Sequence, residues 1–219
     1  MEIYDLKNLK KRINTSLFLF ILVLLIFSFD FMLIYFLIVL GVLSILEFIE
    51  ISKKAFKNKI SCISSNIFFM TYILIFCLIF VYFSSNILSK YITFILLLGC
   101  VASDIGGFVF GKMFNGPKLT KISPNKTYAG ALGSIVLTMI VVNILSFYFL
   151  NILNIKTLIL ALSVSIFCQL GDLLFSLLKR KANLKDTGNF LPGHGGVLDR
   201  IDGILVGLPL SFLTILILN

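Results

Sequence analysis

The residue types that could support chemistry are concentrated between Ser176 and Gly203, in the stretch SLLKRKANLKDTGNFLPGHGGVLDRIDG. This stretch holds five basic residues, three aspartates and one histidine, His194, which three glycines flank. A basic segment beside a membrane commonly does no more than bind anionic headgroups. That role leaves the glycines unexplained, because a glycine-rich turn can offer several backbone N–H groups to phosphate oxygens.

Two aspartates of the same stretch add a second element of a reactive site. Asp199 and Asp202 are three positions apart, so on a helix they share one face at the start of the last apolar run. Carboxylates placed there could hold a divalent cation between themselves and a polyphosphate. Cations, an amide-rich loop and paired carboxylates together are typical of metal-assisted phosphoryl or nucleotidyl transfer.

The elements that position these groups must be membrane-spanning helices, because the chain is too apolar for a soluble domain. Of its 219 residues 59% are hydrophobic, and the mean hydropathy is +1.07. Soluble domains are only about 45–50% apolar. We therefore expect an all-α, polytopic transmembrane helix bundle.

Apolar runs separated by polar breaks predict seven spans, with the N-terminus in the cytoplasm. These spans are residues 15–29, 31–50, 63–83, 91–111, 129–150, 157–178 and 203–218. The first two form an almost unbroken apolar run from Leu17 to Leu46, which exceeds one span of about 17–25 residues. A tight hairpin near Ser28–Asp30 would divide the run. One long tilted helix is the alternative, and it would reverse the orientation of everything downstream.

The placement of the basic residues favours the hairpin. With seven spans, 17 of the 19 basic residues lie on the inside and only Lys90 and Lys156 lie outside, as the positive-inside rule predicts. Both polar loops, residues 112–128 and 179–202, then face the cytoplasm at the cell membrane. Because membrane orientation accounts for the net charge of +9, we expect no nucleic-acid partner.

One carboxylate, Asp104, lies well inside a predicted span. Such a group costs at least about 2.5–3.5 kcal/mol to insert, so it should face a partner, a cavity or a metal within the bundle. Gly99, Ser103, Gly107 and Gly111 recur every fourth residue on the same helix and let another helix approach closely. A hydrogen bond in helix packing is therefore the alternative role for Asp104.

A second polar stripe lies at the C-terminal end of the predicted span 157–178. Asp172, Ser176 and Lys179 share one helix face just before the polar loop. By itself this stripe is also compatible with a solvated helix end, at which the lysine extends toward the headgroups.

The stretch from Ser176 to Asp202 resembles the signature of the phosphatidate cytidylyltransferase family. That pattern runs Ser-x-apolar-Lys-Arg, four residues, Lys-Asp, a small residue, an apolar-Pro pair, His-Gly-Gly and Asp-Arg-apolar-Asp. The residues that fit it are Ser176, Leu178, Lys179, Arg180, Lys185, Asp186, Gly188, Leu191, Pro192, His194, Gly195, Gly196, Asp199, Arg200, Ile201 and Asp202. DIGGFVFGK at 104–112 and KISPNKTYAG at 121–130 look like two further blocks, so the resemblance covers roughly residues 95–210.

The resemblance implies that CTP and phosphatidic acid give CDP-diacylglycerol and pyrophosphate, with Mg²⁺ as cofactor. It implies metal-binding roles for Asp172, Asp199 and Asp202, with Asp104 as a further candidate. It implies catalytic roles for Lys179, Arg180, Lys185, Asp186, His194 and Arg200. It implies substrate binding by Ser123, Lys126, Ser176, Gly195 and Gly196. We also expect an N-terminal membrane segment over residues 1–94 and a catalytic membrane domain over 95–219, and a homodimer is compatible with this arrangement.

Two departures from the family pattern and three other functions bear on this interpretation. Ala129 stands where the family often has Glu, and the chain is shorter than many members.

A CTP-using lipid kinase could employ the same nucleotide site but would release CDP. A CDP-alcohol phosphotransferase should show Asp-Gly, Ala-Arg and spaced Asp motifs close together, and this combination is not found in the sequence. A transporter would not need the signature.

Overall fold

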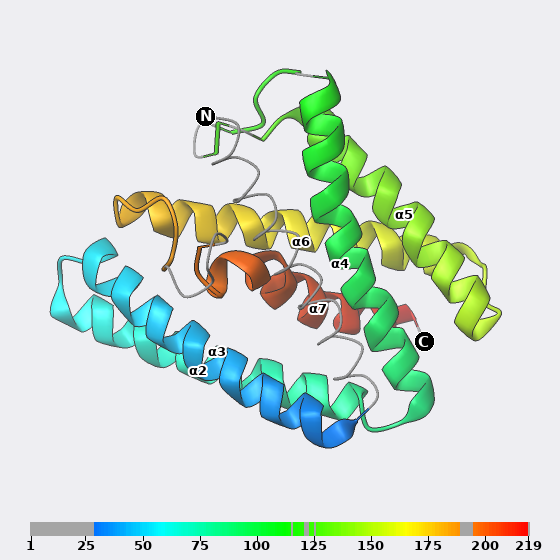
Figure 1. The fold of residues 1–219 in the computed structure, drawn as a ribbon, viewed down its shortest axis with the longest axis horizontal. Coiled ribbons are helices and arrows are strands. Elements are labelled where there is room, and N and C mark those ends of the chain that lie inside the picture. Colours follow the sequence, from blue (N-terminus) through cyan, green and yellow to red (C-terminus); the bar gives the residue numbers. More distant parts are fainter. Residues whose placement is uncertain (1–28, 115, 121–122, 125, 189–194, 219) are drawn as a thin grey trace, which may run out of the picture. The chain divides into compact units, whose positions relative to one another are not determined.

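The computed structural model describes residues 29–114, 116–120, 123–124, 126–188 and 195–218, and within these ranges the fold is built of long helices (Figure 1). The helices are α2 (Asp30–Ala55), α3 (Lys59–Phe83), α4 (Ile87–Phe114), α5 (Tyr128–Leu150), α6 (Ile155–Lys181) and α7 (Leu198–Leu218). The predicted all-α class is confirmed.

Each of the six described helices is long and apolar enough to cross a bilayer. They coincide with the second to seventh predicted spans, so the chain is a multi-pass membrane protein. The first predicted span, residues 15–29, lies outside the described residues except for Phe29. Phe29 has an extended backbone and α2 begins at Asp30, so no single helix continues through this position.

The described chain divides into two compact units. The first comprises residues up to Cys77 together with Lys181–Arg200, and the second comprises Leu78–Arg180 with Ile201–Asn219. These boundaries differ from the division at residues 94 and 95, which stays a prediction. Each unit is described by itself below.

In the first unit α2 and α3 form an antiparallel helix pair (Figure 1). The rings of Phe48 and Phe69 stack with their centroids 3.9 Å apart. One turn further along α2, the Ser52 hydroxyl donates a 2.6 Å hydrogen bond to Asn66 Oδ1. The apolar stacking and this polar contact together fix the register of α2 against α3 near the C-terminal end of α2.

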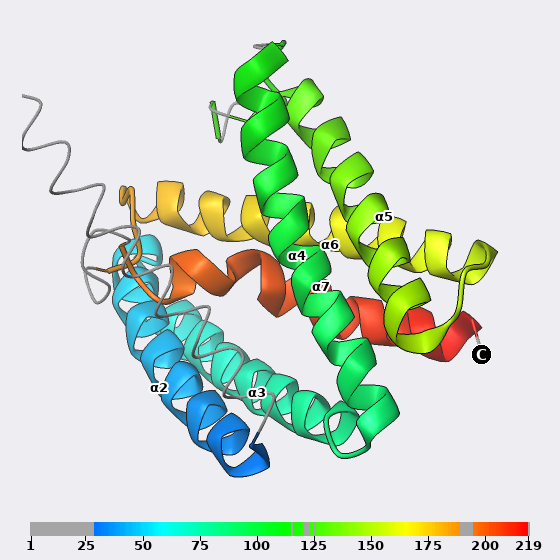
Figure 2. The ribbon, with the colours of Figure 1, turned by 45° about the vertical axis from the view of Figure 1, so that its right-hand side comes forward.

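In the second unit α4 and α5 run side by side, as Figure 2 shows, and the small residues predicted to allow a close approach lie at their contact. Ser134 Oγ donates to the carbonyl oxygen of Ser103 at 2.7 Å. A Cβ atom added at Gly107 would lie 2.8 Å from Ser134 Oγ. The helix-packing role of the stripe is therefore confirmed, and α5 is the helix that it admits.

Another close approach of the second unit joins α6 to α7, which also lie side by side (Figure 2). A Cβ atom added at Gly171 would lie 2.6 Å from the carbonyl oxygen of Asp202 and 3.0 Å from Val206 Cβ. Only glycine permits this separation of the two backbones. The contact brings the polar end of α6 directly against the start of α7.

Candidate functional site

The connection between α4 and α5 is folded so that it presents Lys126. The Leu119 N–H donates to the carbonyl oxygen of Lys126 at 2.7 Å, and the Tyr128 N–H donates to that of Pro117 at 3.1 Å. These bonds pair the two arms of the connection antiparallel. Thr127 then caps α5 by accepting a hydrogen bond from the Gly130 N–H.

Lys126 and Asp172 form an ion pair between this connection and α6, although they are far apart in sequence. Their side chains keep 24% and 34% of their accessible surface, so the pair is open to solvent or to a substrate. A partly exposed ion pair contributes only about 0–1 kcal/mol to stability. Its residues are therefore available for exchange with a ligand at little cost in folding free energy.

A second ion pair, between Lys179 of α6 and Asp202 of α7, is more deeply buried. Lys179 Nζ lies 3.8 Å from Asp202 Oδ2, and the two side chains keep only 13% and 11% of their surface. The Gly203 N–H also donates to Asp202 Oδ1 at 2.9 Å. Lys179 thus pairs with α7, whereas the ion partner of Asp172 is Lys126, in the connection between α4 and α5.

Three of the four predicted metal ligands belong to this second unit. Asp172 and Asp202 are each paired with a lysine, Lys126 and Lys179 respectively. Asp104 is exposed on α4 rather than enclosed between helices. Among the described residues no three His, Cys, Asp or Glu side chains are grouped as ligands for a metal ion.

The described part of the loop that carries the rest of the signature, residues 182–188 and 195–197 (the signature loop), belongs to the first unit. Gly195 has a φ of +80°, a conformation that other residues rarely adopt. Asp186 lies beside it, because a Cβ atom at Gly195 would be 3.7 Å from Asp186 Cβ. The predicted unusual backbone is confirmed at Gly195.

Asp199 is engaged with this loop and not with Asp202. Its Oδ2 accepts hydrogen bonds from the Thr187 N–H at 2.8 Å and from the Gly196 N–H at 3.1 Å. The Gly196 N–H, which we predicted to be available to phosphate, is therefore taken up within the loop. Asp199 and Asp202 share a helix, as predicted, but the structure gives their carboxylates different partners.

Glu47 of α2 is the residue that the sequence interpretation missed. It is buried, and its carboxylate accepts three hydrogen bonds from Thr187, Val197 and Leu198. Glu47 lies inside the predicted span 31–50, where an ionisable residue marks a candidate functional position by default. That signal could have identified Glu47, whereas nothing in the sequence links it to the signature loop 140 residues away.

The other predicted site residues take less specific positions. Ser176 is half-buried on α6, and Ser123 is half-buried in the connection before α5. Four charged residues are exposed: Arg180, Lys185, Asp186 and Arg200. His194 lies outside the described residues. The structure thus forms two groups, one around Asp172 and Asp202 in the second unit and one around Asp199 in the first.

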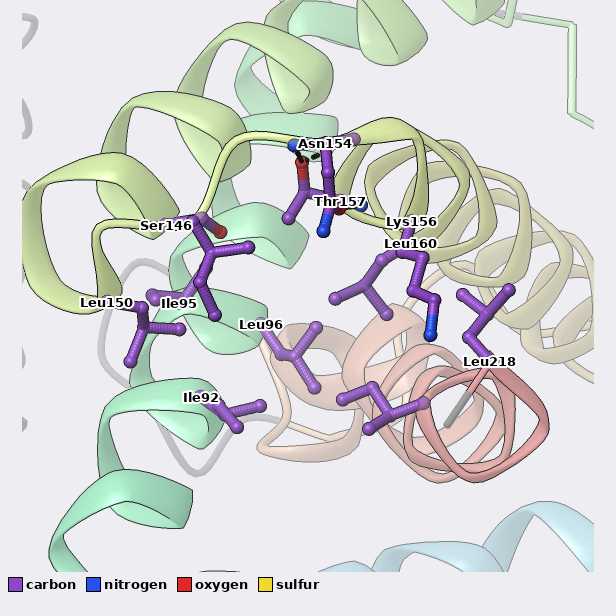
Figure 3. Close-up of a pocket in the computed structure, with 12 residues that line it drawn as sticks. Ile92, Ile95, Leu96, Ser146, Leu150, Asn154, Lys156, Thr157, Leu160 and Leu218 are labelled. Atoms are coloured by element: carbon purple, nitrogen blue, oxygen red, sulfur yellow. Dashed lines mark hydrogen bonds between the residues drawn. The ribbon is translucent and has the colours of Figure 1, made fainter.

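The second unit also contains a mainly apolar cavity of about 290 Å³, drawn in Figure 3. Its wall comes from α4, α5, α6 and α7 and includes one cation, Lys156. Lys156 and Lys179 lie 23 residues apart on α6, which corresponds to about 35 Å along a helix. The cavity therefore lies at the opposite end of the helices from the charged pairs, and none of its lining residues is a carboxylate.

Comparison with known proteins gives several similar relatives that carry one name. The chain is 38% identical over 144 residues to a phosphatidate cytidylyltransferase of Rickettsia bellii, covering 60% of this chain and 61% of that protein. It is 43% identical over 113 residues to the Bacillus subtilis protein of the same name, covering 51% and 42%. The Helicobacter pylori (strain J99) protein of that name gives 42% over 112 residues, also covering 51% and 42%.

The aligned stretch thus spans about half the length of the curated relatives that it matches. A family model described as "Cytidylyltransferase family" matches residues 54–218, which include every described site residue predicted above. Because this match extends over most of the chain, the chain belongs to the cytidylyltransferase family.

Proposed function

We propose that this protein transfers the cytidylyl group of CTP to phosphatidic acid, giving CDP-diacylglycerol and pyrophosphate. The observation that carries the proposal is the family match over residues 54–218, together with the two ion pairs that form within this region, Lys126–Asp172 and Lys179–Asp202. Relatives that carry the name phosphatidate cytidylyltransferase are about 40% identical over half of the chain or more. Phospholipid synthesis would be the pathway served.

The reaction needs alignment and charge neutralisation more than covalent help. An oxygen of the lipid phosphate attacks the α-phosphorus of CTP, the new P–O bond forms, and the bond to the β-phosphate oxygen breaks to release pyrophosphate. The nucleophile is already an anion, so no general base is required. Lys126 and Lys179 would exchange their aspartate partners for phosphate oxygens, and Arg180, Lys185 and Arg200 would add positive charge.

The residues of the second unit fit a magnesium ion. Mg²⁺ is usually held by one or two carboxylates together with substrate phosphates and water. Asp172 of α6 and Asp202 of α7 supply two such carboxylates, each of which already has a cationic partner, and Asp104 is a further candidate. The ion, when bound, would neutralise the polyphosphate charge. Asp199 Oδ2 already accepts two backbone N–H groups, so we place Asp199 in the ordering of the loop first.

Products of the purified full-length chain test the proposed reaction. With CTP labelled at the α-phosphate and in the cytidine, phosphatidic acid and Mg²⁺, we expect both labels in a chloroform-soluble product and unlabelled pyrophosphate in the water phase. A lipid kinase would instead leave labelled CDP in water and act on an alcohol such as a polyprenol. Formation of CDP without pyrophosphate would contradict the proposal and favour the kinase.

We further propose that the protein lies in the cell membrane with its site facing the cytoplasm, where CTP is available. Single cysteines at Lys118, between α4 and α5, and at Ser85, between α3 and α4, test this orientation because both positions are exposed. In intact cells an impermeant maleimide should label Ser85→Cys but not Lys118→Cys.

Permeabilised cells should then show labelling at both positions, and the unsubstituted chain gives the background from its own four cysteines. Labelling of Lys118→Cys alone in intact cells would contradict the orientation and place the nucleotide site on the other face.

A further inference from the structure

The carboxylate of Glu47 connects α2 to the signature loop within the first unit. Glu47 lies ahead of residue 54, where the family match begins, and it is 8% exposed. We propose that Glu47 is a positioning residue: it holds the signature loop and the start of α7 in the conformation that the transfer reaction requires. This inference rests on the proposed function for its kinetic consequence, but not for its structural one.

Three hydrogen bonds carry the contact. Glu47 Oε1 accepts from the Val197 N–H at 2.8 Å. Its Oε2 accepts from the Leu198 N–H at 2.8 Å and from the Thr187 hydroxyl at 2.9 Å. Both carboxylate oxygens are therefore used, by the Thr187 hydroxyl of the signature loop and by the N–H groups of Val197 and Leu198, where the loop meets α7. A single side chain thus ties Thr187 to the start of α7.

The two backbone donors lie at the N-terminus of α7: Leu198 is its first residue and Val197 directly precedes it. The N–H groups at a helix N-terminus have no partner inside the helix, and they carry the positive end of the helix dipole. A carboxylate satisfies both requirements at once, and a hydrogen bond to a charged acceptor is stronger than one between neutral groups. Val197 and Leu198 are themselves buried, so water would replace the carboxylate poorly.

Thr187 links Glu47 to a predicted site residue. Its hydroxyl donates to Glu47, and its N–H donates to Asp199 Oδ2 at 2.8 Å. The space around this link is fully occupied, because a Cβ atom at Gly196 would lie 2.0 Å from Thr187 Oγ1 and 2.5 Å from Glu47 Oε2. Loss of Glu47 would therefore release Thr187, and with it one anchor of Asp199.

Hydrogen–deuterium exchange tests the structural half of the inference on the full chain in lipid nanodiscs, without any substrate. In Glu47→Gln we expect faster exchange at Thr187, Val197 and Leu198 by at least tenfold, because the amide keeps one acceptor but loses the charge. Glu50→Gln is the matched control, since Glu50 is exposed on the same helix. Unchanged protection at Val197 and Leu198 in Glu47→Gln would overturn the proposal.

Kinetics test the positioning half. Residues that orient a site's primary groups typically cost 10–100-fold when lost. We expect kcat/KM for CTP to fall on the order of 10–100-fold in Glu47→Gln, mainly through KM for CTP, and to change less than about twofold in Glu50→Gln. A purely structural defect would instead lower the active fraction, and hence kcat, with KM unchanged; that result would overturn the positioning role.

Thr187→Val and Thr187→Ser provide a second pair in case Glu47→Gln fails to fold. Valine removes the hydroxyl donor at nearly constant shape, whereas serine keeps it. We expect Thr187→Val to raise KM for CTP, as Glu47→Gln does, and Thr187→Ser to have a KM close to that of the wild type. Equal KM values for the two variants would contradict a role for the hydrogen bond between Thr187 and Glu47. If the wild type makes no CDP-diacylglycerol, the proposed function fails, and the exchange result still decides whether Glu47 orders the loop.

Discussion

Asp202→Asn is expected to lower kcat/KM for CTP by about 100–1000-fold, the range typical of removing one strong electrostatic group or metal ligand. Asp202 is held against Lys179 at 3.8 Å, and both side chains are nearly buried. Asparagine keeps the shape but leaves the lysine without its charge partner in poorly hydrated surroundings. Initial rates at saturating Mg²⁺ measure the loss of activity, and thermal unfolding in the same detergent measures the loss of stability.

The double variant Lys179→Gln/Asp202→Asn separates folding from chemistry. Breaking one partner of a buried ion pair destabilises a protein by about 3–5 kcal/mol, whereas a neutral pair of similar volume is tolerated. We therefore expect the double variant to recover the melting temperature but not the turnover. Near-normal turnover in Asp202→Asn, or turnover regained in the double variant, would remove Asp202 from the site and leave it a packing role.

Gly171→Ala should cost turnover on the order of 100-fold, because it forces α6 and α7 apart at the site. The added Cβ atom would lie 2.6 Å from the Asp202 carbonyl oxygen, which is backbone and cannot rotate away. A misplacement of about 1 Å at reacting groups can cost 100-fold in rate. The same overpacking should lower the free energy of unfolding by about 1–3 kcal/mol, so rates are normalised to folded protein.

Gly116→Ala is the control for Gly171→Ala. A Cβ atom at Gly116 would meet its nearest neighbours at 3.6 Å and 4.0 Å, which is ordinary contact. We expect its turnover and melting temperature to stay close to those of the wild type. If Gly171→Ala melts lower but turns over normally once normalised, the spacing of the two helices does not govern the reaction.

The sequence by itself determined the class of protein and most of its elements. Membrane helices can be predicted from local composition, because a helix needs about 20 consecutive apolar residues to cross a bilayer. Six predicted spans are therefore found as helices in the structure. The sequence also predicted the stripe of small residues, because a spacing of four places its members on one face of one helix. These members are Gly99, Ser103, Gly107 and Gly111.

The sequence also contained the family signature, and with it most of the site's residue types. Spacing along one helix placed Asp172 and Lys179 on one face of α6. It also placed Asp199 and Asp202 on one helix. In both cases the information is local, because residues three, four or seven apart keep a fixed relation in any α-helix.

Partners between helices were decided only by the tertiary structure. Lys126 meets Asp172, Lys179 meets Asp202, and Asp199 turns to the Thr187 and Gly196 amides of the signature loop. No periodicity encodes these choices, since each depends on the angle and depth at which one helix packs against another.

Glu47 shows most clearly what the sequence alone does not predict. In the sequence it is one carboxylate in an apolar run, with no motif and no neighbour that suggests a role. In the structure it accepts three hydrogen bonds from donors 140 to 151 residues further along the chain. Such a contact exists only after α2 has packed beside the signature loop, and burial then requires that every N–H group at the start of α7 find an acceptor.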